Sequence, residues 1–226
     1  MIALVPLKGF RDGKTRLSAV LDEETRGRLA FWMMRRVLRS LAVAESVERV
    51  VLISKDVDAR SAAQTLGADS FFEESADLNG ALREAVSAFR DSPDREVAAS
   101  GLPPEAILII PADLPLLKPE DVDAMAALRA TEAPCVVAAP SRRGEGTNAL
   151  LLHPPDVLSP SFGPDSFNGH RARAVASGVA FREHRSAGLG LDIDLPEDLE
   201  SLRGALDPKA LSGLSKILAL GPVVSP

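Results

Sequence analysis

The chain has 226 residues, of which 46% are hydrophobic and 26% charged, the balance of an ordinary globular protein rather than a disordered or collagen-like chain. Its 26 basic and 32 acidic residues leave a net charge of −6, which argues against broad binding to nucleic acid or a membrane surface. One cysteine excludes an internal disulfide and a cysteine metal cage. There is no long apolar run and no charged leader segment, so we expect a cytoplasmic protein without a membrane partner.

Strand-like and helix-like segments alternate along the chain. An apolar stretch at residues 2–6 predicts a first strand, and apolar residues recurring every four positions from Leu29 to Leu41 predict a helix capped by Asp22. Further strands are expected at residues 50–53, 106–110, 135–139, 149–153 and 179–183. Further helices are expected at residues 58–66, 78–89, 119–130, 167–177 and 196–202, and a polar loop at 92–104. This alternation predicts an α/β fold, a mostly parallel sheet with helices on both faces.

The domain organisation is expected to be simple. The sequence shows no internal repeat and no linker-like stretch, which favours one domain over residues 1–204. An apolar tail follows at residues 205–226, and we expect it to pack on the domain or at an interface, for example in a homodimer.

A basic, glycine-containing stretch follows the first expected strand. Ligands of such sheets bind beyond the carboxyl ends of the strands, so this stretch is a candidate site. Its four cations are Lys8, Arg11, Lys14 and Arg16. Cations and backbone amides together can cradle an anion, although the spacing is not that of a P-loop. The alternative is a solvated basic loop.

Three aspartates are candidate metal ligands. Asp113 lies between two prolines at the end of the most apolar expected strand. Asp192 and Asp194 point the same way in an extended segment, where two carboxylates repel unless a cation lies between them. Oxygen ligands of this kind suit Mg²⁺. The alternatives are a turn cap for Asp113 and a helix N-cap for Asp194.

Hydroxyl and amide side chains stand at expected turns and helix starts. Thr147 follows a glycine-containing turn, and Ser166 precedes a helix start, where amides bind anions. Asn79 opens another helix, which fits base recognition or capping. For His170 the residues alone leave a structural and a functional role equally open.

Six segments of the chain form a pattern when they are taken together. They are Pro6-Leu7-Lys8 with Lys14-Thr15-Arg16-Leu17-Ser18; Leu78-Asn79-x-Ala81; Pro111-Ala112-Asp113-Leu114-Pro115-Leu116; Gly146-Thr147-Asn148-Ala149-Leu150; Phe162-Gly163-x-x-Ser166; and Leu191-Asp192-Ile193-Asp194-x-Pro196-Glu197-Asp198-Leu199. In this order, over about residues 2–203, they resemble the guanylyltransferases of coenzyme F420 biosynthesis, the CofC/FbiD family.

The resemblance implies a fold, a reaction and roles for individual residues. The fold is that of the nucleotide-diphospho-sugar transferases. The reaction joins GMP from GTP to a small phosphorylated acid, phosphoenolpyruvate first of all, and releases pyrophosphate. A second enzyme then joins the unstable product to the deazaflavin precursor Fo. The implied roles are Lys14 and Asp113 in catalysis; Lys8, Lys14, Arg16, Ser54 and Asn79 in nucleotide binding; Thr147, Gly163 and Ser166 in acid binding; and Asp113, Asp192 and Asp194 as Mg²⁺ ligands.

Several alternatives stay open. The acid could be 2-phospho-L-lactate or 3-phospho-D-glycerate. The chain could also be another nucleotidyltransferase of this fold, such as a molybdenum-cofactor guanylyltransferase, although that family's longer glycine-rich loop is absent after residue 6. The third alternative is a nucleotide-binding module without turnover, which would not need the three aspartates.

Overall fold

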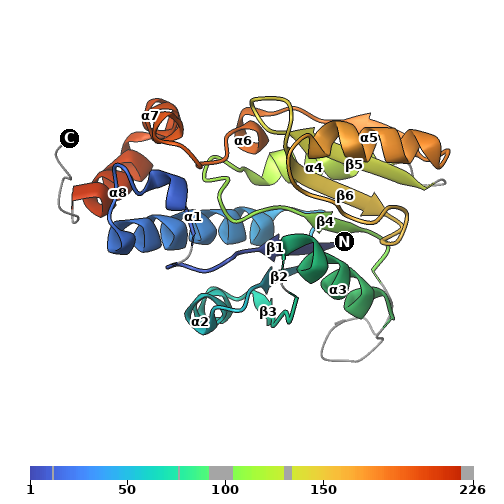
Figure 1. The fold of residues 1–226 in the computed structure, drawn as a ribbon, viewed down its shortest axis with the longest axis horizontal. Helices are drawn as coiled ribbons and strands as arrows, with labels where there is room; N and C mark the ends of the chain where they lie inside the picture. Colours follow the sequence, from blue (N-terminus) through green and yellow to red (C-terminus); the bar gives the residue numbers. More distant parts are fainter. Residues whose placement is uncertain (12, 76, 92–103, 130–133, 220–226) are drawn as a thin grey trace.

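Seven strands form one sheet in the computed structural model, which describes residues 1–11, 13–75, 77–91, 104–129 and 134–219 (Figure 1). The strand order is β3-β2-β1-β4-β6-β5-β7. The strands are β1 (Ile2–Pro6), β2 (Arg49–Ile53), β3 (Asp69–Phe71), β4 (Ile107–Ile109), β5 (Cys135–Pro140), β6 (Thr147–His153) and β7 (Ala180–Glu183). Only β6 runs antiparallel to its neighbours in the described sheet, which confirms the prediction of a mostly parallel α/β fold.

Helices follow most strands, as the alternation predicts. They are the 3₁₀ turn η1 (Thr15–Leu17), α1 (Glu23–Val43), α2 (Val57–Thr65), α3 (Leu78–Asp91), α4 (Pro119–Ala127), α5 (Ser166–Ala176), α6 (Ala187–Gly190), α7 (Pro196–Ala205) and α8 (Pro208–Ala219). The sequence did not predict β3, η1 and α6, which are three or four residues long. The predicted loop lies outside the described residues at 92–103, as does the predicted helix end at residue 130. Among the described helices, none has the length and apolarity needed to cross a membrane.

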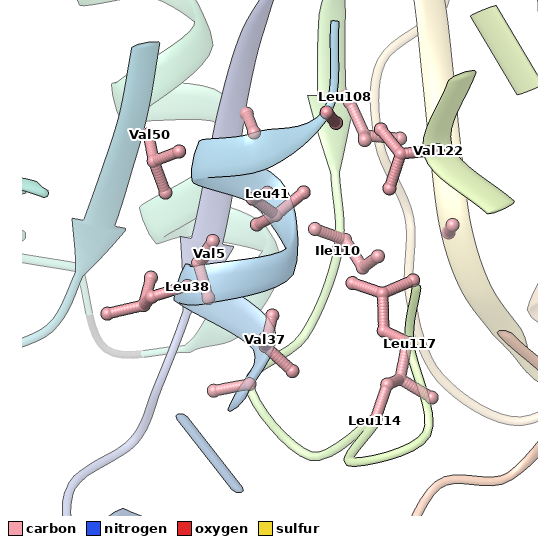
Figure 2. Close-up of a cluster of buried hydrophobic side chains, with 14 of the residues drawn as sticks. Val5, Val37, Leu38, Leu41, Val50, Leu108, Ile110, Leu114, Leu117 and Val122 are labelled. Atoms are coloured by element: carbon pink, nitrogen blue, oxygen red, sulfur yellow. The ribbon is translucent and has the colours of Figure 1, made fainter. Parts of the chain in front are cut away.

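The two faces of the sheet are buried by different helices. On one face, α1, α2 and α4 pack on side chains such as Val5 and Leu108 (Figure 2). Leu38 and Leu41 of α1 point into this cluster. On the other face, α3 and α5 cover the alternate strand residues, such as Leu4. Burial on both faces explains why these strands read as continuous apolar runs.

The ends of α1 and α8 show how the sequence directs local structure. Asp22 is the N-cap of α1, as predicted, and accepts a hydrogen bond from the Thr25 amide at 2.7 Å. The described part of the 205–226 tail forms α8, which lies along α1. Leu214 of α8 is fully buried in a cluster that includes Trp32 of α1.

The order of strands places two loops side by side. β1 pairs with β2 on one side and with β4 on the other, so the chain leaves β1 toward one edge and later returns to its opposite side. Such a switch point opens a crevice at the carboxyl ends of the two strands. The loop after β1 and the segment after β4, which carries Asp113, meet there.

Candidate functional site

The loop after β1 is held in a strained shape. Gly9 has φ +139, and a Cβ there would lie 3.0 Å from Oδ2 of Asp56, so a side chain is excluded. The same Oδ2 accepts a hydrogen bond from the Phe10 amide at 2.8 Å. Lys14 adopts the left-handed conformation with φ 55, which costs a non-glycine residue about 1–2 kcal/mol. Strain of this kind persists where surrounding contacts hold the residue in place, and the contacts of Lys14 with two carboxylates have this effect.

The Lys14 ammonium lies between two carboxylates at the switch point. Its Nζ donates to Asp113 Oδ2 and, at 2.8 Å, to Asp194 Oδ1. Only 11% of the Lys14 side chain is exposed. Burial acts to lower the pKa of Lys14, but the charges of Asp113 and Asp194 more than offset it and hold that pKa above its ordinary value. Lys14 is therefore charged throughout the physiological range.

Asp192 lies beside this ion-paired cluster, and no lysine or arginine of the described residues pairs with it. Its Oδ1 accepts a hydrogen bond from Asn148 Nδ2 at 3.2 Å. Burial raises the pKa of Asp192, the Asn148 bond opposes the rise, and the nearby charges of Asp113 and Asp194 add to it. For Asp194 the burial effect is overcome by Lys14, which lowers the pKa of that carboxyl. The cluster thus carries more negative than positive charge.

The donor set fits a hard divalent cation, although the three aspartates do not form a ready-made cage. Among the described residues, buried Asp113 Oδ1 has no hydrogen-bond partner, so it is available as a ligand. Asp192 supplies a second carboxylate oxygen. Burial raises the pKa of this carboxyl, and a bound cation would stabilise its charged form. In the described part of the chain, however, no three carboxylate, imidazole or thiolate groups converge, because Lys14 bridges Asp113 and Asp194.

A cleft of about 710 Å³ opens beside the cluster, within the usual range for small-molecule sites. Lys8, Lys14 and Asp113 line it, together with the glycines of the loop after β1 and the first turn of α3. A hollow of about 830 Å³ lies between that loop, α1 and α8. Arg11 of the basic stretch lines it, but none of the residues to which the resemblance assigns a role does. The cleft at the switch point is therefore the candidate nucleotide site.

Two predicted nucleotide-binding residues lie near this cleft without lining it. Arg16 is 72% exposed, and its Nη1 is 3.8 Å from Asp194 Oδ2. Ser54 is buried, and its Oγ accepts a hydrogen bond from the Asp56 amide at 3.1 Å, which helps to start α2. Its neighbours Ile53 and Lys55 line the cleft instead.

The predicted acid-binding residues form a second group. Ser166 Oγ accepts a hydrogen bond from the Thr147 amide at 3.0 Å, so the first residue of α5 is fixed to the start of β6. Thr147 Oγ1 lies 3.0 Å from Nδ1 of His170, one turn further along α5. Gly163 has φ +144, a conformation that side chains rarely adopt. This second group does not line the 710 Å³ cleft.

Asn79 connects the two groups. Its Nδ2 donates to the Phe162 carbonyl at 2.9 Å, and its Oδ1 accepts from the Phe162 amide at 2.6 Å. The amide thus fastens the loop that carries Gly163 to the first turn of α3, whose residues Leu78 and Ala81 line the cleft. The predicted contact between Asn79 and a base stays a prediction.

The structure adds functional residues for which the sequence assigned no role in the site. Asn148 Nδ2 bridges Asp192 and the Leu189 carbonyl, the latter at 2.8 Å. Asp198 is only 1% exposed and binds Arg142 and Arg143, both at 3.0 Å. Its other oxygen accepts from the amide of Asp194 at 3.1 Å. The sequence predicts Asp198 only in the first turn of a helix. Its position a few residues after the predicted ligands Asp192 and Asp194 is the one sign in the sequence that it belongs to the site.

Comparison with known proteins agrees with the family resemblance seen in the sequence. A family model described as "Guanylyl transferase CofC like" matches residues 1–205. A phosphoenolpyruvate guanylyltransferase of Rubrobacter xylanophilus is 40% identical over 205 residues, 91% of this chain and 94% of that protein. A 2-phospho-L-lactate guanylyltransferase of Methanothermobacter thermautotrophicus is 36% identical over 198 residues, 87% of this chain and 81% of that protein.

Solved structures agree in fold. A protein from Desulfovibrio desulfuricans, described as a nucleotide-diphospho-sugar transferase, superposes with a TM-score of 0.71 at 15% identity and covers 96% of both chains. Glucosyl-3-phosphoglycerate synthase of Mycobacterium tuberculosis, solved with Mg²⁺ and uridine diphosphate, gives a TM-score of 0.58 at 12% identity. It covers 96% of this chain and 79% of that one. These likenesses confirm the predicted nucleotide-diphospho-sugar transferase fold.

Proposed function

Because the chain belongs to the family of CofC-like guanylyl transferases, we propose that it transfers the guanylyl group of GTP to phosphoenolpyruvate and releases pyrophosphate in coenzyme F420 biosynthesis. The observation that carries the proposal is the whole-domain family match together with the Lys14, Asp113 and Asp194 cluster at the switch point. A nucleotide-binding module without turnover would not need three carboxylates gathered beside the cleft, whereas a metal-assisted transfer uses them.

The proposed reaction is an in-line displacement at the α-phosphorus of GTP. A phosphate oxygen of the acid forms the new bond to phosphorus, and the bond between the α-phosphorus and the β-bridging oxygen breaks. No protein nucleophile is required, because positioning and charge stabilisation supply the catalysis. Lys8, Lys14 and Arg16 would bind the triphosphate. Lys8 and Lys14 line the cleft, Arg16 lies beside it, and the charge that Lys14 keeps supports this role.

We assign Asp113, Asp192 and Asp194 to a bound Mg²⁺. When bound, the ion would offset the negative charge of the phosphates and of the leaving pyrophosphate. The unpartnered Asp113 oxygen and the excess of carboxylate over cation support this assignment. Lys14 holds Asp113 and Asp194 in position, and Asn148 orients Asp192.

The acid is assigned to the second group. Thr147, Gly163 and Ser166 offer a hydroxyl, an unobstructed backbone and a helix N-terminus, which together suit a phosphate or carboxylate. Asn79 fastens the loop that carries Gly163 to the first turn of α3, which lines the cleft, so the acid would bind next to the nucleotide. We further propose that the labile product passes directly to the Fo-transferring enzyme, and that the reaction takes place in the cytoplasm.

The test is pyrophosphate release from GTP and Mg²⁺, with phosphoenolpyruvate, 2-phospho-L-lactate and 3-phospho-D-glycerate supplied separately. The Fo-transferring enzyme and Fo should be present as a trap for the product. We expect release with phosphoenolpyruvate, loss of activity in a chelator, and recovery when Mg²⁺ is restored. Release with only one of the other acids would change the acceptor. If folded protein that still binds GTP released nothing with any of the three, the proposed reaction would be wrong.

A further inference from the structure

His170 is completely buried on α5, and both of its ring nitrogens lie within hydrogen-bonding distance of polar groups on other segments. Nε2 lies 3.2 Å from the Ser161 amide, and Nδ1 lies 3.0 Å from Thr147 Oγ1. The ring of Phe162 packs edge-on against the imidazole, with the centroids 5.5 Å apart. These contacts fix both the position and the orientation of the ring.

The Ser161 contact determines which ring nitrogen carries the hydrogen. A main-chain amide can only donate, so Nε2 must accept and must be unprotonated. Burial, together with the nearby charge of Arg173, lowers the pKa of His170 to about 4, although a hydrogen bond with the Ser166 main chain opposes the shift. A neutral imidazole has one hydrogen, and it must therefore be on Nδ1.

The Nδ1 hydrogen in turn determines how Thr147 uses its hydroxyl. With the hydrogen on Nδ1, Oγ1 can face that nitrogen only as an acceptor, also where the Nδ1 hydrogen is shared with the Ser166 carbonyl. The hydrogen of the threonine hydroxyl must therefore point elsewhere. Within the described chain, Oγ1 has no other hydrogen-bond partner. The hydroxyl hydrogen is thus left for a ligand.

From this arrangement the geometry points to His170 as a positioning residue that forces the Thr147 hydroxyl to donate to the acid substrate. The inference rests on the proposed function, in which Thr147 contacts the acid. An anionic phosphate or carboxylate can only accept hydrogen bonds, so a hydroxyl with a preset donor direction favours it over a ligand group that donates. His170 therefore contributes to selection of the phosphorylated acid without touching it.

A pair of substitutions separates this role from simple anchoring of the loop. In asparagine the amide nitrogen can take the place of Nδ1, which faces Thr147. In glutamine the amide oxygen can take the place of Nε2, which accepts from the Ser161 amide. We expect His170→Asn to keep the donor to Thr147 and to retain a KM for the acid close to that of the wild type. His170→Gln should raise that KM roughly tenfold, the scale for a hydrogen bond to a charged group, and leave the KM for GTP unchanged. If His170→Asn raised the acid KM and His170→Gln did not, anchoring of Ser161 through Nε2 would explain the effect and the inference would be overturned. An equal rise in both variants would overturn it as well, because the donor to Thr147 would then make no difference.

A double-mutant cycle with Thr147→Val distinguishes failure of the inference from failure of the proposed function. Thr147→Val alone should raise the acid KM by roughly 10- to 100-fold, and adding His170→Gln should raise it no further. A Thr147→Val enzyme with an unchanged acid KM would refute the assignment of Thr147 itself. An effect of Thr147→Val without any effect of His170→Gln would refute only the role of His170.

Nuclear magnetic resonance gives a test that does not depend on any variant folding. The long-range ¹H–¹⁵N spectrum of the wild-type protein at neutral pH should show His170 neutral, with the hydrogen on Nδ1. A spectrum with the hydrogen on Nε2 would overturn the inference.

Discussion

Replacing Asp113 by asparagine removes one negative charge from the cluster while keeping the shape of the side chain. Lys14 would remain paired with Asp194 at 2.8 Å, so the buried ammonium would not be left alone. Breaking a buried pair outright costs about 3–5 kcal/mol. Because one partner remains and Asp113 is 23% exposed, we expect a loss of only about 1–2 kcal/mol in the free energy of unfolding. The melting temperature should fall by roughly 2–8 °C.

The effect of the same substitution on turnover should be much larger. Removing one group that stabilises charge in the transition state typically lowers kcat by about 10²- to 10³-fold. A protein with an unfolding free energy of about 5–15 kcal/mol stays folded after losing 1–2 kcal/mol, so unfolding cannot mimic such a loss. The assay is pyrophosphate release at saturating GTP and acid, with calorimetric titration of GTP to verify that the nucleotide site persists.

Asp123→Asn is the matched control. Asp123 is likewise a hydrogen-bonded carboxylate, but its donors include the main-chain amides of Ser46 at 2.9 Å and Glu45 at 3.2 Å, and it lies on α4 away from the cleft. We expect a small loss of stability and unchanged turnover. A folded Asp113→Asn enzyme whose kcat stayed within about threefold of the wild type would refute both the metal assignment and the catalytic role of Asp113.

Three further predictions concern the residues that hold the site together. Asp198→Asn should lower the free energy of unfolding by about 2–4 kcal/mol in chemical denaturation, since a buried carboxylate that binds two arginines loses its charge; an unchanged midpoint would contradict this. Because the pKa of His170 is lowered from 6.5 to about 4, the unfolded chain binds its proton first as pH falls, and stability should decrease between these values by roughly 3 kcal/mol at most. His170→Gln should remove that part of the acid sensitivity, so identical pH curves for both proteins would be the contrary result. Asn79→Ala should raise the acid KM several-fold, because the Phe162 loop loses both hydrogen bonds, while an effect confined to the KM for GTP would favour base recognition instead.

Hydrophobic patterning in the sequence was enough to predict most of the fold. The apolar runs of β1 and β2 and the four-residue spacing of α1 follow from burial, which acts on every residue of an element and therefore leaves a periodic trace. The cap at Asp22 follows from local hydrogen bonding. Short elements such as β3 and α6 leave no such trace, because three or four residues are too few to show a period.

Several predicted site residues came together only in the folded structure. The sequence indicates that the basic stretch, Asp113 and Asp194 are candidates for phosphate and metal chemistry, since residue type alone limits what each can bind. It does not indicate that Lys14 pairs with two carboxylates that follow it by 99 and 180 residues. That contact depends on β1 and β4 being neighbours in the sheet, which is a property of the strand order and not of either segment.

The orientation of donors and acceptors was likewise decided by tertiary structure. The sequence left His170 without a role, because nothing near it in the chain sets the state of an imidazole. Burial keeps the ring neutral, and the Ser161 amide and Thr147 hydroxyl assign its single hydrogen. Residue identity determined which chemistry is available to this protein. Contacts between distant segments decided which groups are charged and which way each hydrogen bond points. Charge state and bond direction depend on local solvation and on partners that only folding supplies.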